Sequence, residues 1–275
     1  MILIIGVDGL LGNFLFEKFK LKSNVIGTSR KRFSNNIIQY DILNPLSDLV
    51  IEWKKIESVI ITAACSNVGF CELNPHFSNE INYVAITKII KFLKTKNIPV
   101  VIFSSEYVFD GQYGGYTEFS EKSPNTHYGL QKSKLEDYVI NFYPKSTIFR
   151  ISKLFSISNK NSFVFKMINE INNNNFYNAA VDQFFTPINL EDCFKIILYA
   201  ISFKKYGVFN LCGNDNYSRY SLAIKLKNSL KLNGKINKCF ISDISLDYKI
   251  PLNLTMSCEK IKKEFKINPN SLKFI

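Results

Sequence analysis

A glycine-rich turn near the start of the chain separates a short apolar run from a longer helix-like segment. Residues 1–5 are continuously apolar, as in a buried strand, and residues 10–21 predict a helix. The turn between them carries Gly6, Gly9 and Gly12. A strand, a G-x-x-G-x-x-G turn and a helix in this order predict the first βα unit of a dinucleotide-binding sheet. The alternative interpretation is a tight turn without a ligand.

Each glycine of this turn has a predicted role. Gly6 permits the sharp turn, Gly9 lets the backbone approach a pyrophosphate, and Gly12 lets the helix pack closely on the strand. Leu10 and Leu11 open the helix, where free N–H donors and the helix dipole favour phosphate oxygens. We therefore expect all five residues to contact a dinucleotide cofactor.

The residues after the second predicted strand indicate which cofactor binds. An NAD site places an acid near this point, where it accepts a hydrogen bond from a ribose hydroxyl. Residues 27–32 read GTSRKR and contain no acid. Ser29, Arg30 and Lys31 are suited instead to a 2′-phosphate. We expect NADP(H), with NAD(H) as a second candidate and a solvated basic turn as the alternative without a ligand.

Apolar runs and amphipathic segments alternate along the first half of the chain. Strands are predicted at 24–28, 37–40, 57–62, 99–104 and 146–150, and helices at 77–94 and 128–142. Continuously apolar strands between amphipathic helices indicate a parallel sheet covered on both faces. The predicted fold class is α/β: a Rossmann-type doubly wound parallel sheet with a smaller C-terminal substrate-binding lobe.

The second half is expected to return to the sheet once before it completes the smaller lobe. A helix is predicted at 190–203 and a strand at 207–211. We therefore assign residues 1–155 and about 188–212 to the NADP-binding Rossmann domain. Residues from about 156–187 and 213–275 are assigned to the substrate-binding lobe.

Three polar residues are predicted to meet at the carboxyl edge of this sheet. Ser105 directly follows the strand 99–104, whereas Tyr128 and Lys132 share one face of the next helix. An ammonium beside a phenol lowers the phenol pKa, which suits Tyr128 to protonate a carbonyl oxygen as hydride arrives. Ser105 would bond to the same carbonyl, so all three are predicted catalytic residues. A surface Tyr/Lys pair near loop serines is the alternative.

Charge, hydropathy and cysteine spacing argue against nucleic-acid, membrane and metal partners. The net charge is +12, but the basic residues are scattered, so we expect anionic small ligands and no nucleic acid. No stretch approaches the ~20 apolar residues of a membrane span, so no membrane partner is expected. The six cysteines and two histidines show no metal-ligand spacing, and no metal is predicted. Free thiols fit a reducing cytoplasm.

Short motifs of one enzyme family recur over nearly the whole chain. The most specific is SSEYVFDG at residues 104–111, close to the family's STDYVFDG. Others are YDI at 40–42, AACSNV at 63–68, the Y-x-x-x-K of Tyr128 and Lys132, FRIS at 149–152, VDQFFTP at 181–187 and GVFNLCG at 207–213. With these segments the chain resembles the extended short-chain dehydrogenase/reductases, and within them the dTDP-4-dehydrorhamnose reductase group.

The resemblance implies a reaction and further contacts. Hydride would pass from NADP(H) to C4 of a 4-keto nucleotide-activated (deoxy)sugar, with Tyr128 protonating the nascent alkoxide and Lys132 also holding the nicotinamide ribose. Cofactor contacts are implied for Asp41, Ile42, Ala63, Ala64, Cys65, Tyr128 and Lys132. Relatives commonly form dimers, so a homodimer is a further expectation.

Several positions depart from the family pattern. Ser105 replaces a Thr and Glu106 an Asp, and Lys153 stands where rhamnose reductases carry a Trp against the sugar ring. Arg219 opens a predicted helix of the smaller lobe, where an arginine can meet a substrate diphosphate. We expect substrate contacts from Ser105, Glu106, Lys153 and Arg219, with the sugar left unassigned.

Two other activities belong to similar proteins. The β subunit of methionine adenosyltransferase has similar motifs and acts as a non-catalytic NADP-binding regulatory subunit. Nucleotide-sugar epimerases and dehydratases share the fold, but the dehydratases carry an Asp-Glu pair after the catalytic Thr. Here Ser105 is followed by Glu106 alone, which favours simple reduction.

Overall fold

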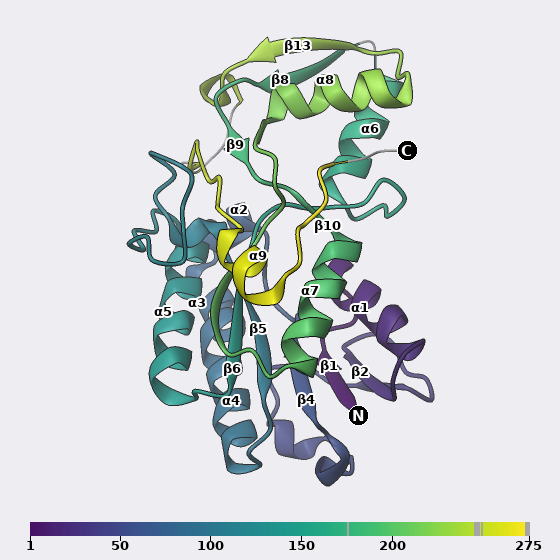
Figure 1. Cartoon of the computed structure of the whole chain (residues 1–275), viewed down its shortest axis with the longest axis vertical. Helices are drawn as coiled ribbons and strands as arrows, with labels where there is room; N and C mark the ends of the chain where they lie inside the picture. Colours follow the sequence, from purple (N-terminus) through teal and green to yellow (C-terminus); the bar gives the residue numbers. More distant parts are fainter. Residues whose placement is uncertain (175, 245–247, 249, 273–275) are drawn as a thin grey trace.

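Seven parallel strands form the central sheet of the larger lobe (Figure 1). All lie within the residues that the computed structural model describes, 1–174, 176–244, 248 and 250–272. The strands are β1 (Ile2–Ile5), β2 (Val25–Ser29), β3 (Ile37–Gln39), β4 (Ser58–Ile61), β5 (Val100–Ser105), β6 (Ser146–Ile151) and β11 (Gly207–Leu211). Their spatial order is β11-β6-β5-β4-β1-β2-β3. The order reverses between β1 and β4, where sheets of this kind open a ligand crevice.

Both faces of the sheet are buried under helices. In β1, Ile2 and Ile4 pack into the core on one face, whereas Leu3 and Ile5 pack into the core on the other. The first face is covered by α1 (Leu10–Lys20) and α7 (Leu190–Ser202), and the second by α4 (Ile86–Thr95) and α5 (His127–Phe142). Burial on both sides explains why the strands are apolar without alternation. The predicted doubly wound α/β fold is confirmed.

The helix predicted over residues 77–94 is longer and less regular than expected. It consists of α3 (Pro75–Asn79), a π-helical turn (Glu80–Ala85) and α4 in direct succession. A further short helix, α2 (Val68–Leu73), lies in a segment for which no helix was predicted. Its start is capped by Asn67, whose side chain accepts the N–H of Phe70.

The smaller lobe is built on a parallel pair of strands. These are β8 (Phe176–Ala180) and β13 (Lys235–Cys239), covered by α6 (Phe163–Asn173) and α8 (Arg219–Leu230). Its core is formed by apolar side chains of both helices, among them Val164, Met167, Leu222 and Leu226. The two-residue strands β7 (Leu154–Phe155), β9 (Phe184–Phe185), β10 (Ile188–Asn189) and β12 (Tyr217–Ser218) complete the described strands.

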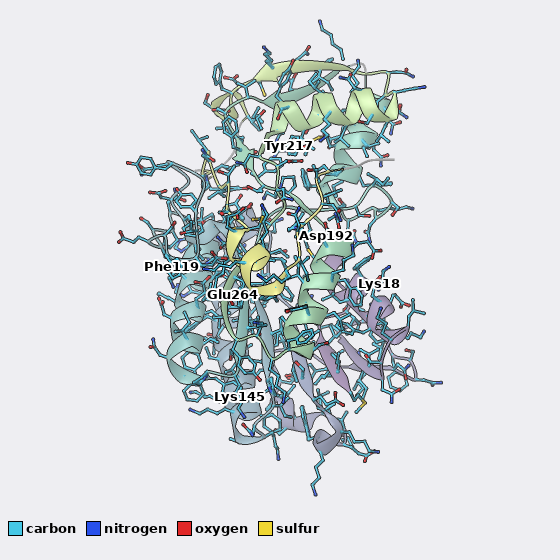
Figure 2. All side chains as sticks on the ribbon, in the orientation of Figure 1. Lys18, Phe119, Lys145, Asp192, Tyr217 and Glu264 are labelled. Atoms are coloured by element: carbon cyan, nitrogen blue, oxygen red, sulfur yellow. The ribbon has the colours of Figure 1, made fainter. Side chains whose placement is uncertain are left out.

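The C-terminal part of the chain packs against both lobes: Leu272 is buried in the core of the smaller lobe, and the residues before it contact the larger one. Helix α9 (Glu259–Phe265) lies within residues 213–275, which we assigned to the smaller lobe, yet Ile261 and Phe265 are buried in the sheet core beside α7. Further on, the backbone and side chain of Asn270 donate to the buried carboxylate of Asp192, at the start of α7 (Figure 2). Residues 245–247, 249 and 273–275 of the assigned lobe lie outside the described residues.

Candidate active site

The glycine turn is shaped by two close backbone contacts. Gly6 has φ +102°, and a Cβ there would lie 2.6 Å from the nitrogen of Ala63. A Cβ on Gly12 would lie 2.2 Å from the carbonyl oxygen of Gly6, so this glycine lets α1 pack on the turn. By contrast, no described atom lies within 4 Å of a Cβ built on Gly9, which is the N-cap of α1. The turn therefore leaves open space above the helix N-terminus.

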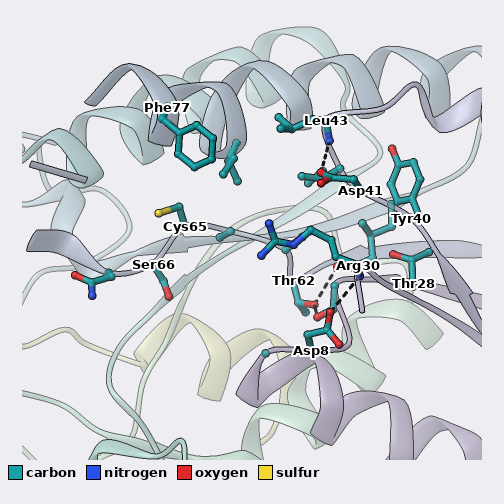
Figure 3. Close-up of a pocket in the computed structure, with 18 of the residues that line it drawn as sticks. Asp8, Thr28, Arg30, Tyr40, Asp41, Leu43, Thr62, Cys65, Ser66 and Phe77 are labelled. Atoms are coloured by element: carbon teal, nitrogen blue, oxygen red, sulfur yellow. Dashed lines mark hydrogen bonds between the residues drawn. The ribbon is translucent and has the colours of Figure 1, made fainter. Parts of the chain in front are cut away.

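A cavity of about 500 Å³ lies at this turn, at the carboxyl ends of β1, β2 and β4 (Figure 3). Eight of the predicted cofactor-binding residues line it: Gly6, Gly9, Arg30, Asp41, Ile42, Ala63, Ala64 and Cys65. Asp8, Thr28, Tyr40 and Phe77 are among the lining residues that we did not predict. The cavity thus brings together segments from the glycine turn to residue 81, as a dinucleotide site at a topological switch point requires.

Other predicted cofactor residues lie outside the described lining of this cavity. Leu11 and Gly12 are buried in α1, and Leu10 packs against the core on the face of the sheet that α1 and α7 cover. Lys31 is exposed on the turn after β2. Ser29 is buried and donates its hydroxyl to Asp8 at 2.7 Å. Tyr128 and Lys132, also predicted to contact the cofactor, are not among the lining residues either. Contact of all these residues with a cofactor stays a prediction.

Asp8 brings a carboxylate to the end of β2 from another part of the chain. Besides Ser29, it accepts hydrogen bonds from the backbone N–H of Arg30 at 3.2 Å and from Nε of Arg32 at 3.1 Å. Burial alone would raise the pKa of Asp8, but the hydrogen bonds from Ser29 and Arg32 outweigh it and hold this pKa below its usual range. Asp8 was not predicted because it lies in the glycine turn, 21 positions before the residue of β2 that it contacts.

The three predicted catalytic residues come together on the rim above β5. Helix α5 is capped by Thr126 and approaches so closely that a Cβ on Gly129 would lie 2.1 Å from the Tyr107 carbonyl oxygen. This contact places Tyr128 on the turn that follows Ser105, and both side chains are buried. Lys132, one helical turn on, has its Nζ 5.8 Å from the centre of the Tyr128 ring.

The electrostatics of this trio differ from the expectation. Burial raises the pKa of Tyr128, whereas an interaction with the Ser105 side chain lowers it. Lys132 donates from Nζ to the carbonyl oxygen of Phe103 at 3.0 Å, and burial lowers its pKa to about 8. Lys132 is not among the principal influences on the Tyr128 pKa, contrary to the expectation; desolvation raises this pKa, so the phenol keeps its proton at neutral pH.

A buried polar network holds the cofactor loop against the catalytic helix. Asn82, in the π-helical turn, accepts the N–H of Cys65 and donates to the Cys65 carbonyl, both at 2.9 Å. It also donates to Oε1 of Gln131 on α5 at 2.8 Å. Gln131 in turn donates to Ser78 at 2.8 Å. The helical pattern of residues 77–94 gave no signal for this role, because a π turn shifts which side chains face the sheet.

The predicted substrate residues lie between the two lobes. The carboxylate of Glu106 is buried, accepts the Ser152 hydroxyl at 2.5 Å and lies 3.7 Å from Nζ of Lys153. Burial raises the pKa of Glu106, and Lys153 counteracts the rise. Arg219 begins α8 of the smaller lobe and donates from Nε to Gln183 at 3.0 Å. Arg219 also lies close enough to Lys153 to influence the Lys153 pKa, so cationic groups of the two lobes lie near each other. That these residues contact a substrate stays a prediction.

Two other classes of site find no support among the described residues. In that part of the chain no three His, Cys, Asp or Glu side chains gather as a metal site would require. None of its helices combines the length and the apolar character needed to cross a bilayer.

Comparison with known proteins gives a family and several relatives. The family model described as RmlD substrate binding domain matches residues 1–273. The probable low-salt glycan biosynthesis reductase Agl14 of Haloferax volcanii is 29% identical over 159 residues, which are 55% of this chain and 53% of the relative, so the match spans about half of that protein's length. Methionine adenosyltransferase 2 subunit beta of Xenopus tropicalis is 23% identical over 95% of this chain and 81% of its own length.

Among solved structures, a dTDP-4-dehydrorhamnose reductase from Clostridium acetobutylicum has the same fold. It superimposes with a TM-score of 0.87 at 27% identity, over 98% of this chain and 94% of that one. Because the family model covers the larger lobe and almost all of the smaller one, the chain belongs to the RmlD substrate binding domain family.

Proposed function

We propose that the chain is an NADP(H)-dependent reductase of a 4-keto nucleotide-activated (deoxy)sugar. The observation that carries this proposal is the position of Tyr128, buried beside Ser105 and Lys132 on the rim above β5. The glycine cavity reaches toward this rim through Cys65, which lines it and lies close enough to Lys132 to influence the Lys132 pKa. The relatives named as reductases support the reaction class. A homodimer belongs to the proposal on the family resemblance alone, and a cytoplasmic location on the free cysteines.

The residues around the cavity fit a dinucleotide. The open space over Gly9 would receive the pyrophosphate at the N-terminus of α1, and Asp41 and Ile42 line the adenine end. Arg30 points into the same cavity (Figure 3), where a guanidinium suits a phosphate. Ala63, Ala64 and Cys65 would flank the path toward the catalytic rim.

When bound, the nicotinamide supplies the hydride. Tyr128 then donates its phenolic proton to the substrate oxygen, since its raised pKa keeps it protonated before the transfer. Ser105 holds the same oxygen through its hydroxyl. Lys132, whose pKa lies near 8, is poised to return a proton to the phenolate while holding a ribose hydroxyl.

The substrate would bind between the lobes. Arg219 would meet the diphosphate, and Lys153 would lie beside the sugar with Glu106 fixing its ammonium. The ammonium also lies 5.1 Å from the centre of the Tyr107 ring, which restrains it further. An ammonium at this place can donate hydrogen bonds to sugar hydroxyls, whereas an aromatic ring would pack against an apolar face of the sugar.

A second candidate is a non-catalytic nucleotide-binding subunit. It is favoured by the likeness to methionine adenosyltransferase 2 subunit beta, which extends over 95% of this chain. The test is the consumption of NADPH with a panel of 4-keto nucleotide-sugars, with Tyr128→Phe as the matched variant. We expect turnover by the natural chain, none by the variant, and equal NADPH binding by both. Absence of turnover across the panel, with an enzyme co-purifying in stoichiometric amount, would favour the subunit instead.

A further inference from the structure

Two cysteines meet between the cofactor cavity and helix α2. Sγ of Cys71, on α2, lies 3.8 Å from Sγ of Cys65, in the loop after β4. The Cys71 thiol also donates to the Cys65 carbonyl oxygen at 3.4 Å. The two thiols are thus in van der Waals contact, and a movement of about 2 Å separates them from a disulfide.

The two thiols differ in their access to small molecules. Cys65 is partly exposed and lines the cavity, on the side away from Tyr40 (Figure 3). Cys71 is fully buried in a cluster with Tyr107 and Tyr128, and α2 packs against α5. Burial raises the pKa of the Cys71 thiol to about 12, so this thiol stays protonated at neutral pH. A reagent that enters the cavity therefore reaches Cys65 first.

The same pair joins the cofactor loop to the catalytic helix. Asn82 bonds to both backbone groups of Cys65, and its Nδ2 lies 3.9 Å from the Cys71 sulfur. Both cysteines lie close enough to Lys132 to influence its pKa. Because α2 holds Cys71 inside the apolar cluster, the Cys65 loop is the part that moves when the sulfurs join. A bond between them therefore pulls this wall of the cavity toward α2.

We propose that Cys65 and Cys71 are a modification site, at which a small-molecule disulfide converts the two thiols to an intramolecular disulfide that weakens cofactor binding. The Cys65 thiolate attacks one sulfur of the small disulfide and releases the other half as a thiolate. Cys71 then attacks Sγ of Cys65 and releases the second half. Each protein thiol gives its proton to a released thiolate, so two thiols are oxidised and one small disulfide is reduced to two thiols.

The state of the pair and the occupancy of the cavity affect each other. A dinucleotide along this wall covers Cys65, and the disulfide displaces the wall. By linkage, the factor by which the disulfide weakens NADPH binding equals the factor by which NADPH favours the dithiol. We expect a factor of at least about five. This coupling rests on the dinucleotide site of the proposed function, whereas formation of the disulfide does not.

The first part of the test maps the disulfide. The full chain is equilibrated in mixtures of reduced and oxidised glutathione, quenched with acid, alkylated in denaturant and digested. We expect the oxidised chain to carry a bond between Cys65 and Cys71. Cys193, which is buried in the sheet core, should stay alkylatable and so report that the chain remained folded. Cys71→Ala should stop at the mixed disulfide of Cys65 with glutathione.

The second part measures the dissociation constant of NADPH by the fluorescence of the bound reduced nicotinamide, which needs no substrate. Oxidation of the natural chain should raise this constant at least about fivefold. Cys65→Ser is the matched control, and its dissociation constant should be the same in reducing and oxidising mixtures. Cys239→Ser removes another partly exposed cysteine, on β13, and should respond to oxidation like the natural chain.

Two results would overturn the inference. In the first, Cys65 and Cys71 both remain alkylatable in the most oxidising mixture, although Cys239 of the same sample carries glutathione. In the second, the disulfide forms but leaves the dissociation constant of NADPH unchanged. If the reduced natural chain binds no NADPH, the proposed function and the coupling fail together, whereas the peptide map still decides on the disulfide.

Discussion

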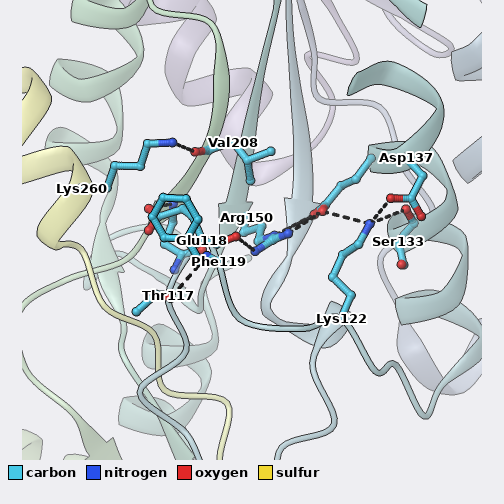
Figure 4. A network of polar contacts seen from close by, with 11 residues as sticks. Thr117, Glu118, Phe119, Lys122, Ser133, Asp137, Arg150, Val208 and Lys260 are labelled. Atoms are coloured by element: carbon cyan, nitrogen blue, oxygen red, sulfur yellow. Dashed lines mark hydrogen bonds and ion pairs between the residues drawn. The ribbon is translucent and has the colours of Figure 1, made fainter. Parts of the chain in front are cut away.

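Glu136, on α5, shares its buried carboxylate with the guanidinium of Arg150, on β6. Nη2 of the arginine lies 2.8 Å from Oε2, and Nε lies 3.1 and 3.2 Å from the two oxygens. Glu136 is one helical turn beyond Lys132 and two beyond Tyr128, so the pair fixes the same face of α5 that carries the chemistry. In Figure 4, Arg150 points from the sheet toward this helix, and Lys122 reaches it from the preceding loop.

Breaking this pair should be costly. Glu136→Gln removes the charge and leaves the buried guanidinium without a counterion, so we expect unfolding free energy to fall by about 3 kcal/mol. Asp137→Asn is the control: its carboxylate is 61% exposed and lies 2.6 Å from Nζ of Lys122, and its loss should cost below about 1 kcal/mol. Urea denaturation of both variants measures the difference. Equal losses would contradict a buried, structurally important pair.

Substitution by alanine should lower stability at one glycine of the turn and weaken dinucleotide binding at another. In Gly12→Ala the new methyl would meet the Gly6 carbonyl at 2.2 Å, so we expect a melting temperature lower by several degrees. Gly9 has φ −79° and open space beyond its Cα, so Gly9→Ala should fold normally and weaken dinucleotide binding, because the methyl projects toward the pyrophosphate. Thermal melts with and without NADPH separate the two effects. A Gly9→Ala variant that NADPH stabilises as fully as the natural chain would place the pyrophosphate elsewhere.

Lys132 should make stability depend on alkaline pH. Its pKa is lowered by burial from 10.5 to about 8, so the unfolded chain holds this proton at pH values where the folded chain has lost it. The free-energy cost of burying the Lys132 ammonium is complete below pH 8 and is relieved as the pH rises toward 10.5, so the free energy of unfolding rises across this window. Relative to Lys132→Met, the natural chain should gain on the order of 3 kcal/mol there. Urea titrations of both proteins from pH 7 to about 10.5 measure this gain, and parallel curves would show that the ammonium is not desolvated.

The sheet could be predicted from the sequence because its strands obey a local rule. β1, β4 and β5 are buried on both faces, so they appear as uninterrupted apolar runs, and the strand ends then place Ser105 and the Tyr128 helix at one edge. The glycine turn was equally visible, since its spacing follows from contacts within one βα unit.

What the sequence could not reveal depends on contacts between distant segments. Asp8 reaches the end of β2 only after β1 and β2 have paired, so a search beside β2 finds cations and no acid. Lys132 turns to the Phe103 carbonyl, an acceptor that every residue carries and no pattern records. The placement of α9 on the sheet depends on Ile261 and Phe265, two apolar residues among lysines.

Asn82 should couple the cofactor loop to the catalytic helix. It is fully buried, and its amide satisfies both backbone groups of Cys65 and the side chain of Gln131. Asn82→Ala leaves the Cys65 N–H and Gln131 Oε1 without partners, whereas the Cys65 carbonyl keeps the Cys71 thiol at 3.4 Å. At about 1–3 kcal/mol for each buried polar group left unpaired, we expect a loss of at least about 2 kcal/mol. Ser78→Ala removes one bond from Gln131 and one to the Pro75 carbonyl but leaves the bonds of Asn82 in place, and it should cost about 1 kcal/mol.

Asn82→Asp tests whether Asn82 positions the cofactor loop, apart from its effect on folding stability. The carboxylate can still accept from the N–H of Cys65, but it cannot donate to the Cys65 carbonyl or to Gln131, and it faces both oxygens with a negative charge. We expect the loop to move away from α5, so that the dissociation constant of NADPH rises at a temperature where circular dichroism shows the variant folded. Ser78→Ala, assayed beside it, should bind NADPH like the natural chain. Equal affinity in Asn82→Asp would mean that the loop holds its position without this amide, and Asn82 would then serve packing alone.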